Sequence, residues 1–293
     1  MKIRLDADVV VYRAGFAAEH TFWKCIHGGE EREFETRKAM LEYAEGLGLV
    51  PGQYVVESRK EVEPLPNALY NVRSIVNSVA EALQADPKED VILYLSGPTN
   101  FRDGVATIKP YKGNRDAAHK PVHAAEIKAM MRNEYTVHTS EDEEADDLLA
   151  YEHYADWTTD PHSTVISTID KDLDMIPGLH YNFVKQESYN VSPAQGIWNF
   201  YKQCLVGDVT DNIPGIQGIG PVRATKLLPP VGTSDEALYL ATLGQYEVAY
   251  GAGAGDRLLE VGRLLWIRRY PHEWWSPPQT LTVNVTEDAC SQS

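Results

Sequence analysis

Acidic side chains gather in three short stretches of the chain that lie far apart in sequence. Their members are Glu144, Asp146, Asp147, Asp170, Asp172, Asp208 and Asp211. Any one pair alone is typical of a solvated helix start, because acids favour helix N-termini. Repetition argues against that interpretation, since crowded like charges are costly unless cations neutralise them. Carboxylate oxygens suit hard cations, so the pattern predicts a site for Mg²⁺ or Mn²⁺.

A glycine-rich stretch, residues 215–228, lies between two expected helices. Closely spaced glycines allow a hairpin tight enough for backbone N–H groups to meet a phosphate. A plain connection between helices is the alternative, but the basic pair that follows favours a helix-hairpin-helix that holds duplex DNA without reading its sequence. The residues expected at the DNA are Gly215, Gly218, Gly220, Arg223 and Lys226.

Tyr111, Lys112 and Arg115 form a third candidate group. Taken by itself, the segment is better interpreted as an exposed basic turn. A lysine and an arginine three residues apart can also clamp a phosphodiester, while the neighbouring aromatic ring stacks on a terminal base. The surrounding motifs must decide between the two interpretations.

The overall charge does not decide whether the chain binds nucleic acid. Lys and Arg number 27 against 43 Asp and Glu, and the net charge of −16 speaks against a simple nucleic-acid-coating protein. Basic residues nevertheless concentrate at 109–132 and 223–226, so a local basic track remains. Three widely spaced cysteines, no signal peptide and no long apolar run favour a cytoplasmic location away from membranes.

Three short apolar runs predict the buried strands that position the acids. They cover residues 3–6, 90–95 and 164–169 and alternate with helical patterns. This alternation is typical of the α/β class, with a mostly parallel sheet and helices on both of its faces. Sites in such sheets form outside the carboxyl ends of the strands. Those ends are expected at Asp6, Ser96 and Asp170.

The remaining pattern predicts the domain organisation. Residues 20–64 look like an insertion, with a hairpin at Gly28–Gly29 and a helix near Thr36–Glu45. Ser140 and Glu143 match a capping box that would open a helix. We expect a catalytic core over 1–190 with a short arch region at 108–140, a helical DNA-binding region over 191–272 and a peripheral tail over 273–293.

Together the motifs resemble the flap endonuclease family of 5′-nucleases, especially the bacteriophage 5′→3′ exonucleases. Five motifs in the family's order carry the resemblance and span most of Met1–Leu228. They are Leu5-Asp6-Ala7-Asp8 followed by Tyr12-Arg13, then Tyr111-Lys112-Gly113-Asn114-Arg115, Glu144-Ala145-Asp146-Asp147, Ser167-Thr168-Ile169-Asp170-Lys171-Asp172, and Gly207-Asp208-Val209-Thr210-Asp211-Asn212-Ile213-Pro214-Gly215 with its hairpin.

The resemblance implies a PIN-like fold and a role for each motif residue. Asp6, Glu144 and Asp146 correspond to ligands of a first metal ion. Ligands of the second would be Asp147, Asp170, Asp172, Asp208 and Asp211. Lys112 and Arg115 would grip the scissile phosphate, with Tyr111 as a stacking surface, and the family hairpin commonly holds K⁺. The implied chemistry is two-metal hydrolysis of DNA.

Two departures from the family pattern lead to hypotheses. The family usually carries a further acid where this chain has Ser96, and Asp8 or Asp103 could replace it. The chain between Lys112 and Glu144 has room for one good helix, which favours an open arch and exonucleolytic trimming over strict threading of a flap.

The expected function is that of a metal-dependent 5′→3′ exonuclease or flap endonuclease in phage DNA replication or degradation. The expected partner is duplex DNA with a 5′ end, nick or flap, and the chain is expected to be a monomer in the host cytoplasm. An RNase H-like activity on RNA–DNA hybrids is the alternative, because the motifs read the backbone rather than the sugar. A DNA-binding module without catalysis is a second alternative, which the complete acid set disfavours.

Overall fold

The computed structural model describes residues 1–114 and 120–278. Its centre is a six-stranded sheet in which only the last strand runs antiparallel to its neighbour. The strand order is β6 (Thr136–Thr139), β5 (Val91–Leu95), β1 (Lys2–Asp6), β7 (Thr164–Ser167), β8 (Gly178–Asn182) and β9 (Glu187–Val191). The three predicted strands are thus adjacent, so their carboxyl ends meet at one edge of the sheet.

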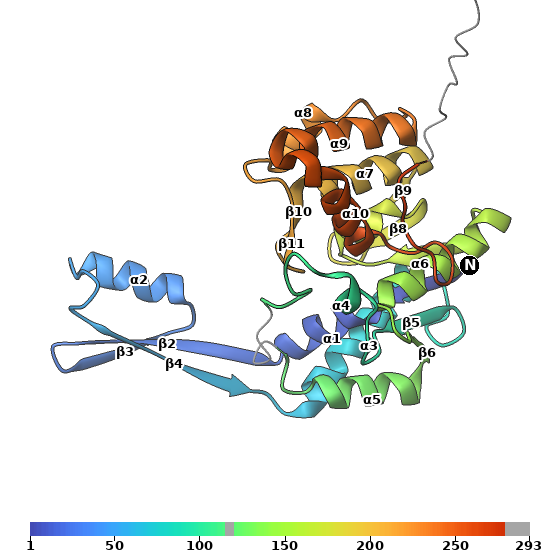
Figure 1. The fold of residues 1–293 in the computed structure, drawn as a ribbon. Helices are drawn as coiled ribbons and strands as arrows, with labels where there is room; N and C mark the ends of the chain where they lie inside the picture. The colour runs from blue at the N-terminus through green and yellow to red at the C-terminus, as the bar shows by residue number, and fades with distance from the viewer. Residues whose placement is uncertain (115–119, 279–293) are drawn as a thin grey trace, which may run out of the picture.

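Helices cover both faces of this sheet (Figure 1). On one face, α1 (Ala7–Phe16), α3 (Leu65–Ala82) and α5 (Ala124–Glu134) bury an apolar cluster with β1 and β5. On the other face lies α6 (Ala145–Thr159), which packs against β1 and β7. The short α4 (Arg102–Val105) and the 3₁₀ helix η2 (Lys171–Met175) lie in the connecting loops.

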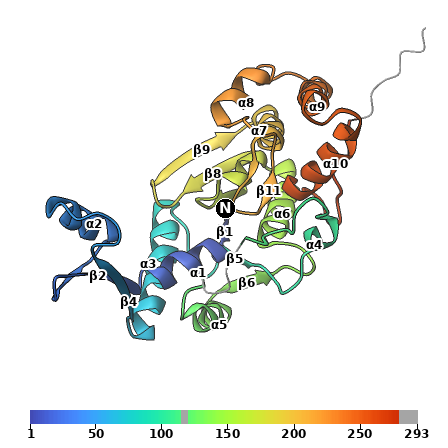
Figure 2. The ribbon, with the colours of Figure 1, turned by 60° about the vertical axis from the view of Figure 1, so that its left-hand side comes forward.

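The chain after the sheet is helical, as Figure 2 shows. Its elements are α7 (Pro193–Val206), the two-residue strands β10 (Gly207–Asp208) and β11 (Ile213–Pro214), α8 (Pro221–Leu227), α9 (Asp235–Tyr250), η3 (Gly251–Gly253) and α10 (Ala254–Leu265). This region shares one apolar core with α6 and β7. The predicted α/β class, with a helical C-terminal region, is confirmed.

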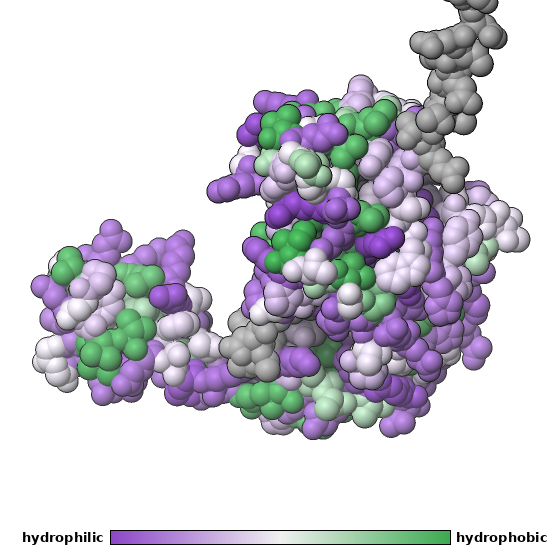
Figure 3. Space-filling view, viewed as in Figure 1, coloured by the Kyte–Doolittle hydropathy of each residue, from purple (hydrophilic) through white to green (hydrophobic). Residues whose placement is uncertain are grey.

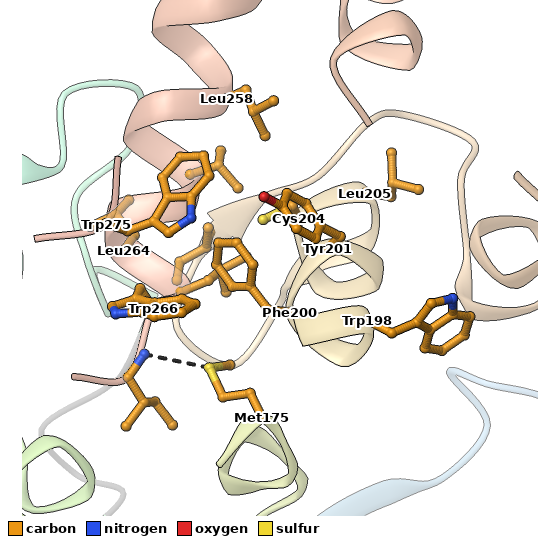
Figure 4. Packing of buried hydrophobic residues seen from close by; sticks show 14 of the residues in the cluster. Met175, Trp198, Phe200, Tyr201, Cys204, Leu205, Leu258, Leu264, Trp266 and Trp275 are labelled. Carbon is orange, nitrogen blue, oxygen red and sulfur yellow. Dashed lines mark hydrogen bonds between the residues drawn. The ribbon is translucent and has the colours of Figure 1, made fainter. Parts of the chain in front are cut away.

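The predicted tail begins inside the fold. The ring of Trp275 is only 6% exposed and lies 5.3 Å from the ring of Phe200 (Figure 4). It also fills the space beside Gly262, where a β carbon would lie 2.3 Å from the indole. The described start of this segment is therefore not wholly peripheral, because Trp275 is part of the core of the helical region.

Residues 19–62 form an arm that projects from the body (Figures 1 and 2). It consists of an antiparallel sheet in the order β3 (Glu30–Phe34), β2 (Glu19–His27), β4 (Val55–Val62), with α2 (Arg37–Gly46) against it. The predicted hairpin is present, and Gly28 and Gly29 supply its positive φ angles of 61° and 86°. Figure 3 shows hydrophilic and apolar side chains mixed over the surface of the arm.

The predicted capping box is wrong. Helix α6 begins at Ala145 with Glu144 as its N-cap, and the Asp147 side chain accepts the Glu144 N–H at 3.2 Å. The Ser140 hydroxyl instead donates to the Glu143 carbonyl at 2.6 Å in the preceding turn. Among the helices of the described residues, none is long and apolar enough to cross a membrane.

Candidate active site

Asp6 is the last residue of β1 and the first of the predicted site acids along the chain. Its carboxylate accepts the Val9 N–H at 3.2 Å, which caps α1, and the Thr168 hydroxyl at 2.9 Å. The residue is only 2% exposed. Burial, and next the charge of Asp8, raise the pKa of the Asp6 carboxyl to about 7.

The first turn of α6 brings two more acids to the same edge of the sheet. Its first amide, that of Ala145, donates to the Ser96 hydroxyl at 3.0 Å, which ties the helix start to the end of β5. Burial raises the pKa of Asp146 well above its usual range, and the charges of Asp6 and Asp170 add to the shift. These electrostatic effects show that acids from three motifs share one region of space.

The turn after β7 carries Asp170 and Asp172. Asp170 accepts the Asp172 N–H at 2.9 Å, so the first acid caps the 3₁₀ helix that contains the second. Burial, then the charges of Asp170 and Asp208, raise the pKa of Asp172 to about 8. The pKa of Asp170 is raised by burial as well.

Two glycines fix the loop that carries Asp208 and Asp211. Gly207 has a φ of 74°, and a β carbon on Gly215 would lie 2.2 Å from the Val206 carbonyl carbon, so only glycines allow this contact. Within the loop, Asp208 accepts the N–H groups of Thr210 and Asp211 at 2.6 and 3.1 Å. Backbone geometry therefore sets the direction of the Asp208 side chain.

These segments enclose a polar pocket of about 130 Å³. Six predicted site acids and one predicted phosphate ligand line it, namely Glu144, Asp146, Asp170, Asp172, Asp208, Asp211 and Lys112. Its wall also contains Arg102, Tyr111, Lys171, Thr210, Ile213, Leu264, Leu265 and Ile267. Asp6 does not line the pocket, but its charge acts on Asp146.

Tyr111 is not an exposed stacking surface, contrary to prediction. Its ring is 9% exposed within the main apolar core, and its hydroxyl lies 2.9 Å from Glu144 and 2.8 Å from Asp211. Lys112 does reach the pocket, where its ammonium group contacts Glu144 and lies 3.6 Å from Asp211. Arg115 lies outside the described residues.

Asp147 is not a pocket residue, and we remove it from the candidate metal ligands and catalytic residues. It is fully buried and forms a two-bond ion pair with Arg102 at 2.5 and 3.0 Å. The third residue of a helix points away from its first two, so Asp147 faces the core while Asp146 faces the pocket. The sequence carried no signal for Arg102, whose partner lies 45 residues away.

The two hypothetical replacements for the family acid at Ser96 lie in different surroundings. Asp8 accepts the Ser96 N–H at 2.8 Å and the Lys128 ammonium at 2.7 Å, and its charge acts on Asp6. It reaches this position from the first turn of α1. Asp103 is exposed on α4 and does not line the pocket.

The glycine-rich stretch forms a tight turn between α7 and α8. Gly218 has a φ of 81°, and Ile216 and Ile219 on either side of it are each 7% exposed and anchor the turn in the core. Arg223 donates to the Gly218 carbonyl at 3.3 Å, and Lys226 follows on the exposed face of α8. Gly215 and Gly220 lie at the two ends of the turn. The backbone at Gly218 and the side chains of Arg223 and Lys226 are exposed on the same part of the chain.

The donor chemistry of the pocket fits Mg²⁺ or Mn²⁺. Its side chains offer hard carboxylate oxygens. Burial, and then the charges of neighbouring acids, raise the pKa values of Asp146 and Asp172, and a divalent cation would offset this cost. Among the described residues, no three His, Cys, Asp or Glu side chains converge as a preformed metal group. Mg²⁺ keeps several waters and uses one or two carboxylates with substrate phosphates, so it does not need such a group.

Comparisons with known proteins give relatives in sequence and in structure. No protein-family model matches the chain. DNA polymerase I of Pseudomonas aeruginosa is 30% identical over 189 residues, which are 57% of this chain and 20% of that protein. DNA polymerase I of Rhizobium leguminosarum is 36% identical over 109 residues, 34% of this chain and 10% of that protein. The chain thus spans about a fifth or less of the length of these relatives.

Among solved structures, the bacteriophage T5 5′-exonuclease with bound zinc is 15% identical, with a TM-score of 0.48 over 90% of this chain and 95% of that one. A T5 flap endonuclease with DNA and metal ions is 19% identical, with a TM-score of 0.43 over 67% and 86%. The chain is thus similar in sequence to DNA polymerases I and in structure to T5 nucleases, which belong to the group that its motifs resemble.

Proposed function

We propose that this protein is a divalent-metal-dependent 5′-nuclease that hydrolyses phosphodiester bonds of DNA. The observation that carries the proposal is the pocket, which gathers acids from three separate motifs around Lys112. A buried structural cluster would pair these acids with cations one by one, as Asp147 is paired with Arg102. Here Glu144 and Asp211 share the single cation Lys112, while burial and then the neighbouring acids raise the pKa values of Asp146 and Asp172.

The same residues suggest how two cations would be held. Asp6, Glu144 and Asp146 would hold one, and the other would be held by Asp170, Asp172, Asp208 and Asp211. When bound, the cations would lower the pKa of an attacking water and offset the charge of the transition state. Lys112 would exchange its contacts with Glu144 and Asp211 for an oxygen of the scissile phosphate and stabilise the charge that develops there.

Duplex DNA would be held by the turn between α7 and α8. The exposed amides around Gly218 can donate to phosphate oxygens, and Arg223 and Lys226 add positive charge beside them. Such a local site is compatible with a net charge of −16, because only the contacting surface needs to be basic. K⁺ bound by carbonyls of this turn would add to its grip on phosphate.

The short arch favours exonuclease activity over strict flap threading. Between Lys112 and Glu144, the described residues contain one α-helix, α5, of 11 residues. That helix packs on the sheet with α1 and α3 and supplies no residue to the pocket lining, so we expect that a free 5′ end need not be threaded. We expect a bulky block on the 5′ end of a flap to reduce cleavage little, and strong inhibition would contradict the open arch.

The test is cleavage of 5′-labelled nicked, blunt, flap and RNA–DNA hybrid substrates with Mg²⁺. EDTA and Asp170→Ala should each abolish cleavage, whereas Asp103→Ala, an exposed acid outside the pocket, should not. Cleavage that survives both EDTA and Asp170→Ala would refute the metal-dependent mechanism. Preference for the hybrid would show the RNase H-like alternative, and DNA binding without cleavage would show a non-catalytic module. A cytoplasmic role in phage DNA replication or degradation is part of this proposal.

A further inference from the structure

A buried ion pair lies at the first turn of α6, next to the two pocket acids of that turn. Arg102 is 2% exposed and Asp147 is fully buried. The two flat groups meet in parallel, with Nη1 to Oδ2 at 2.5 Å and Nη2 to Oδ1 at 3.0 Å. This two-bond geometry fixes the relative orientation of the groups as well as their distance.

Two further N–H groups of Arg102 bind the last turn of α10 and the residue that follows it. Nε donates to the Leu264 carbonyl and Nη2 to the Trp266 carbonyl, both at 2.8 Å. Arg102 therefore joins three segments that are distant in sequence, namely α4, the first turn of α6 and the end of α10. One side chain thereby links the C-terminal region to the pocket end of the sheet, in addition to their shared apolar core.

Both carboxylate oxygens of Asp147 also accept more than one hydrogen bond. Besides Arg102, Oδ1 accepts the Arg268 N–H at 3.0 Å and Oδ2 accepts the Glu144 N–H at 3.2 Å. A carboxylate has about four acceptor positions, and all four are used here. Asp147 thus has the surroundings of a residue that holds the backbone of Glu144, not those of a metal ligand.

We propose that Arg102 and Asp147 are positioning residues that hold Glu144 and Asp146 at the geometry a divalent cation needs. The inference rests on the proposed metal-dependent function. Asp147 lies beside Asp146 in sequence and bonds the amide of Glu144, so a rotation of the ion pair would move both pocket acids. Since buried ion pairs contribute little net stability, orientation is the better physical reason for placing one here.

The experiment uses Arg102→Lys, which keeps the charge but cannot make the two-bond contact. The double variant Arg102→Met with Asp147→Leu removes both charges and leaves neither partner buried alone. The matched control is Arg73→Lys, because Arg73 makes a similar two-bond pair with Glu134 between α3 and α5, away from the pocket. For each protein, the thermal midpoint, the Mn²⁺ affinity without DNA by calorimetry, and kcat and KM on nicked duplex are measured.

The expected result for Arg102→Lys is a folded protein whose Mn²⁺ affinity and kcat fall by roughly 10–100-fold, with KM little changed. The double variant should fold and bind Mn²⁺ as weakly as Arg102→Lys does. Arg73→Lys should have the Mn²⁺ affinity and kcat of wild type. Should Arg102→Lys not fold, the double variant carries the test. Wild-type Mn²⁺ affinity and kcat in a folded Arg102→Lys or double variant would overturn the proposal.

The design separates this inference from the proposed function. If wild-type protein binds Mn²⁺ but cleaves none of the substrates, the nuclease assignment fails. The comparison of Mn²⁺ affinities still decides whether Arg102 and Asp147 position the acids. If the variants bind Mn²⁺ as wild type does while wild type cleaves DNA, the positioning role alone is refuted.

Discussion

Lowering the pH should destabilise this protein through one buried histidine. His153 of α6 is fully buried, with its Nδ1 3.2 Å from the Thr164 hydroxyl and its Nε2 3.1 Å from the Pro177 carbonyl. Burial is the largest cause that lowers the pKa of His153, from 6.5 to about 3. The neutral ring is thus the form that the native protein accommodates.

The sign and size of the effect follow from this shift. Below pH 6.5 the unfolded chain binds a proton at His153 that the native protein does not bind. His153 therefore does not reduce the free energy of unfolding above pH 6.5, and it reduces it progressively as the pH falls toward 3. At pH 5 the loss is about 2 kcal/mol, since each pH unit below the unfolded pKa removes about 1.4 kcal/mol.

The assay is urea unfolding of wild type and His153→Gln at pH 7 and pH 5, in EDTA. The raised pKa values of Asp6 and Asp172 act in the opposite direction, because these acids favour the native state as the pH falls. That contribution is common to both proteins and cancels in the difference between them. His162→Gln, at an exposed position, is the control. Identical pH dependence of wild type and His153→Gln would refute the reasoning.

Three further predictions concern the site. Asp170→Asn should raise the thermal midpoint in EDTA, because it removes one of several crowded charges, and a lower midpoint would contradict the crowding. Lys112→Ala should lower kcat by roughly 10²–10³-fold in single-turnover cleavage with KM little changed, and an unchanged kcat would exclude a role in the transition state. Arg223→Ala and Lys226→Ala should each weaken binding of any duplex and make the slope of log affinity against log salt concentration shallower by about 1. The control Lys38→Ala, on the arm, should change neither.

The sheet and most helices could be predicted because their signals are local. Apolar runs mark β1, β5 and β7, and the helix predicted near Thr36–Glu45 is observed as α2. The hairpin of β8 with β9 was missed, since β9 is mostly exposed and lacks an apolar run. Ser140 was misassigned because its hydroxyl can bond a nearby carbonyl as readily as a helix amide.

Side-chain partners from distant segments could not be predicted. Asp147 has the same sequence signal as Asp146, and only its direction on α6 and the approach of Arg102 separate their roles. Tyr111 was predicted as a stacking surface, yet its ring lies in the core formed with distant helices. In both cases the deciding contact joins residues that no local pattern relates.

The two interpretations of the acids, as turn caps and as metal ligands, are compatible. Asp170 accepts the Asp172 amide and Asp208 accepts the Thr210 amide, so each acid stabilises the turn that presents it to the pocket. Replacement by alanine would therefore remove both the charge and the turn. Asparagine retains an acceptor oxygen for the amide while removing the charge. A loss of metal affinity in Asp208→Asn with an unchanged thermal midpoint would thus report on the charge alone, whereas Asp208→Ala confounds the two roles.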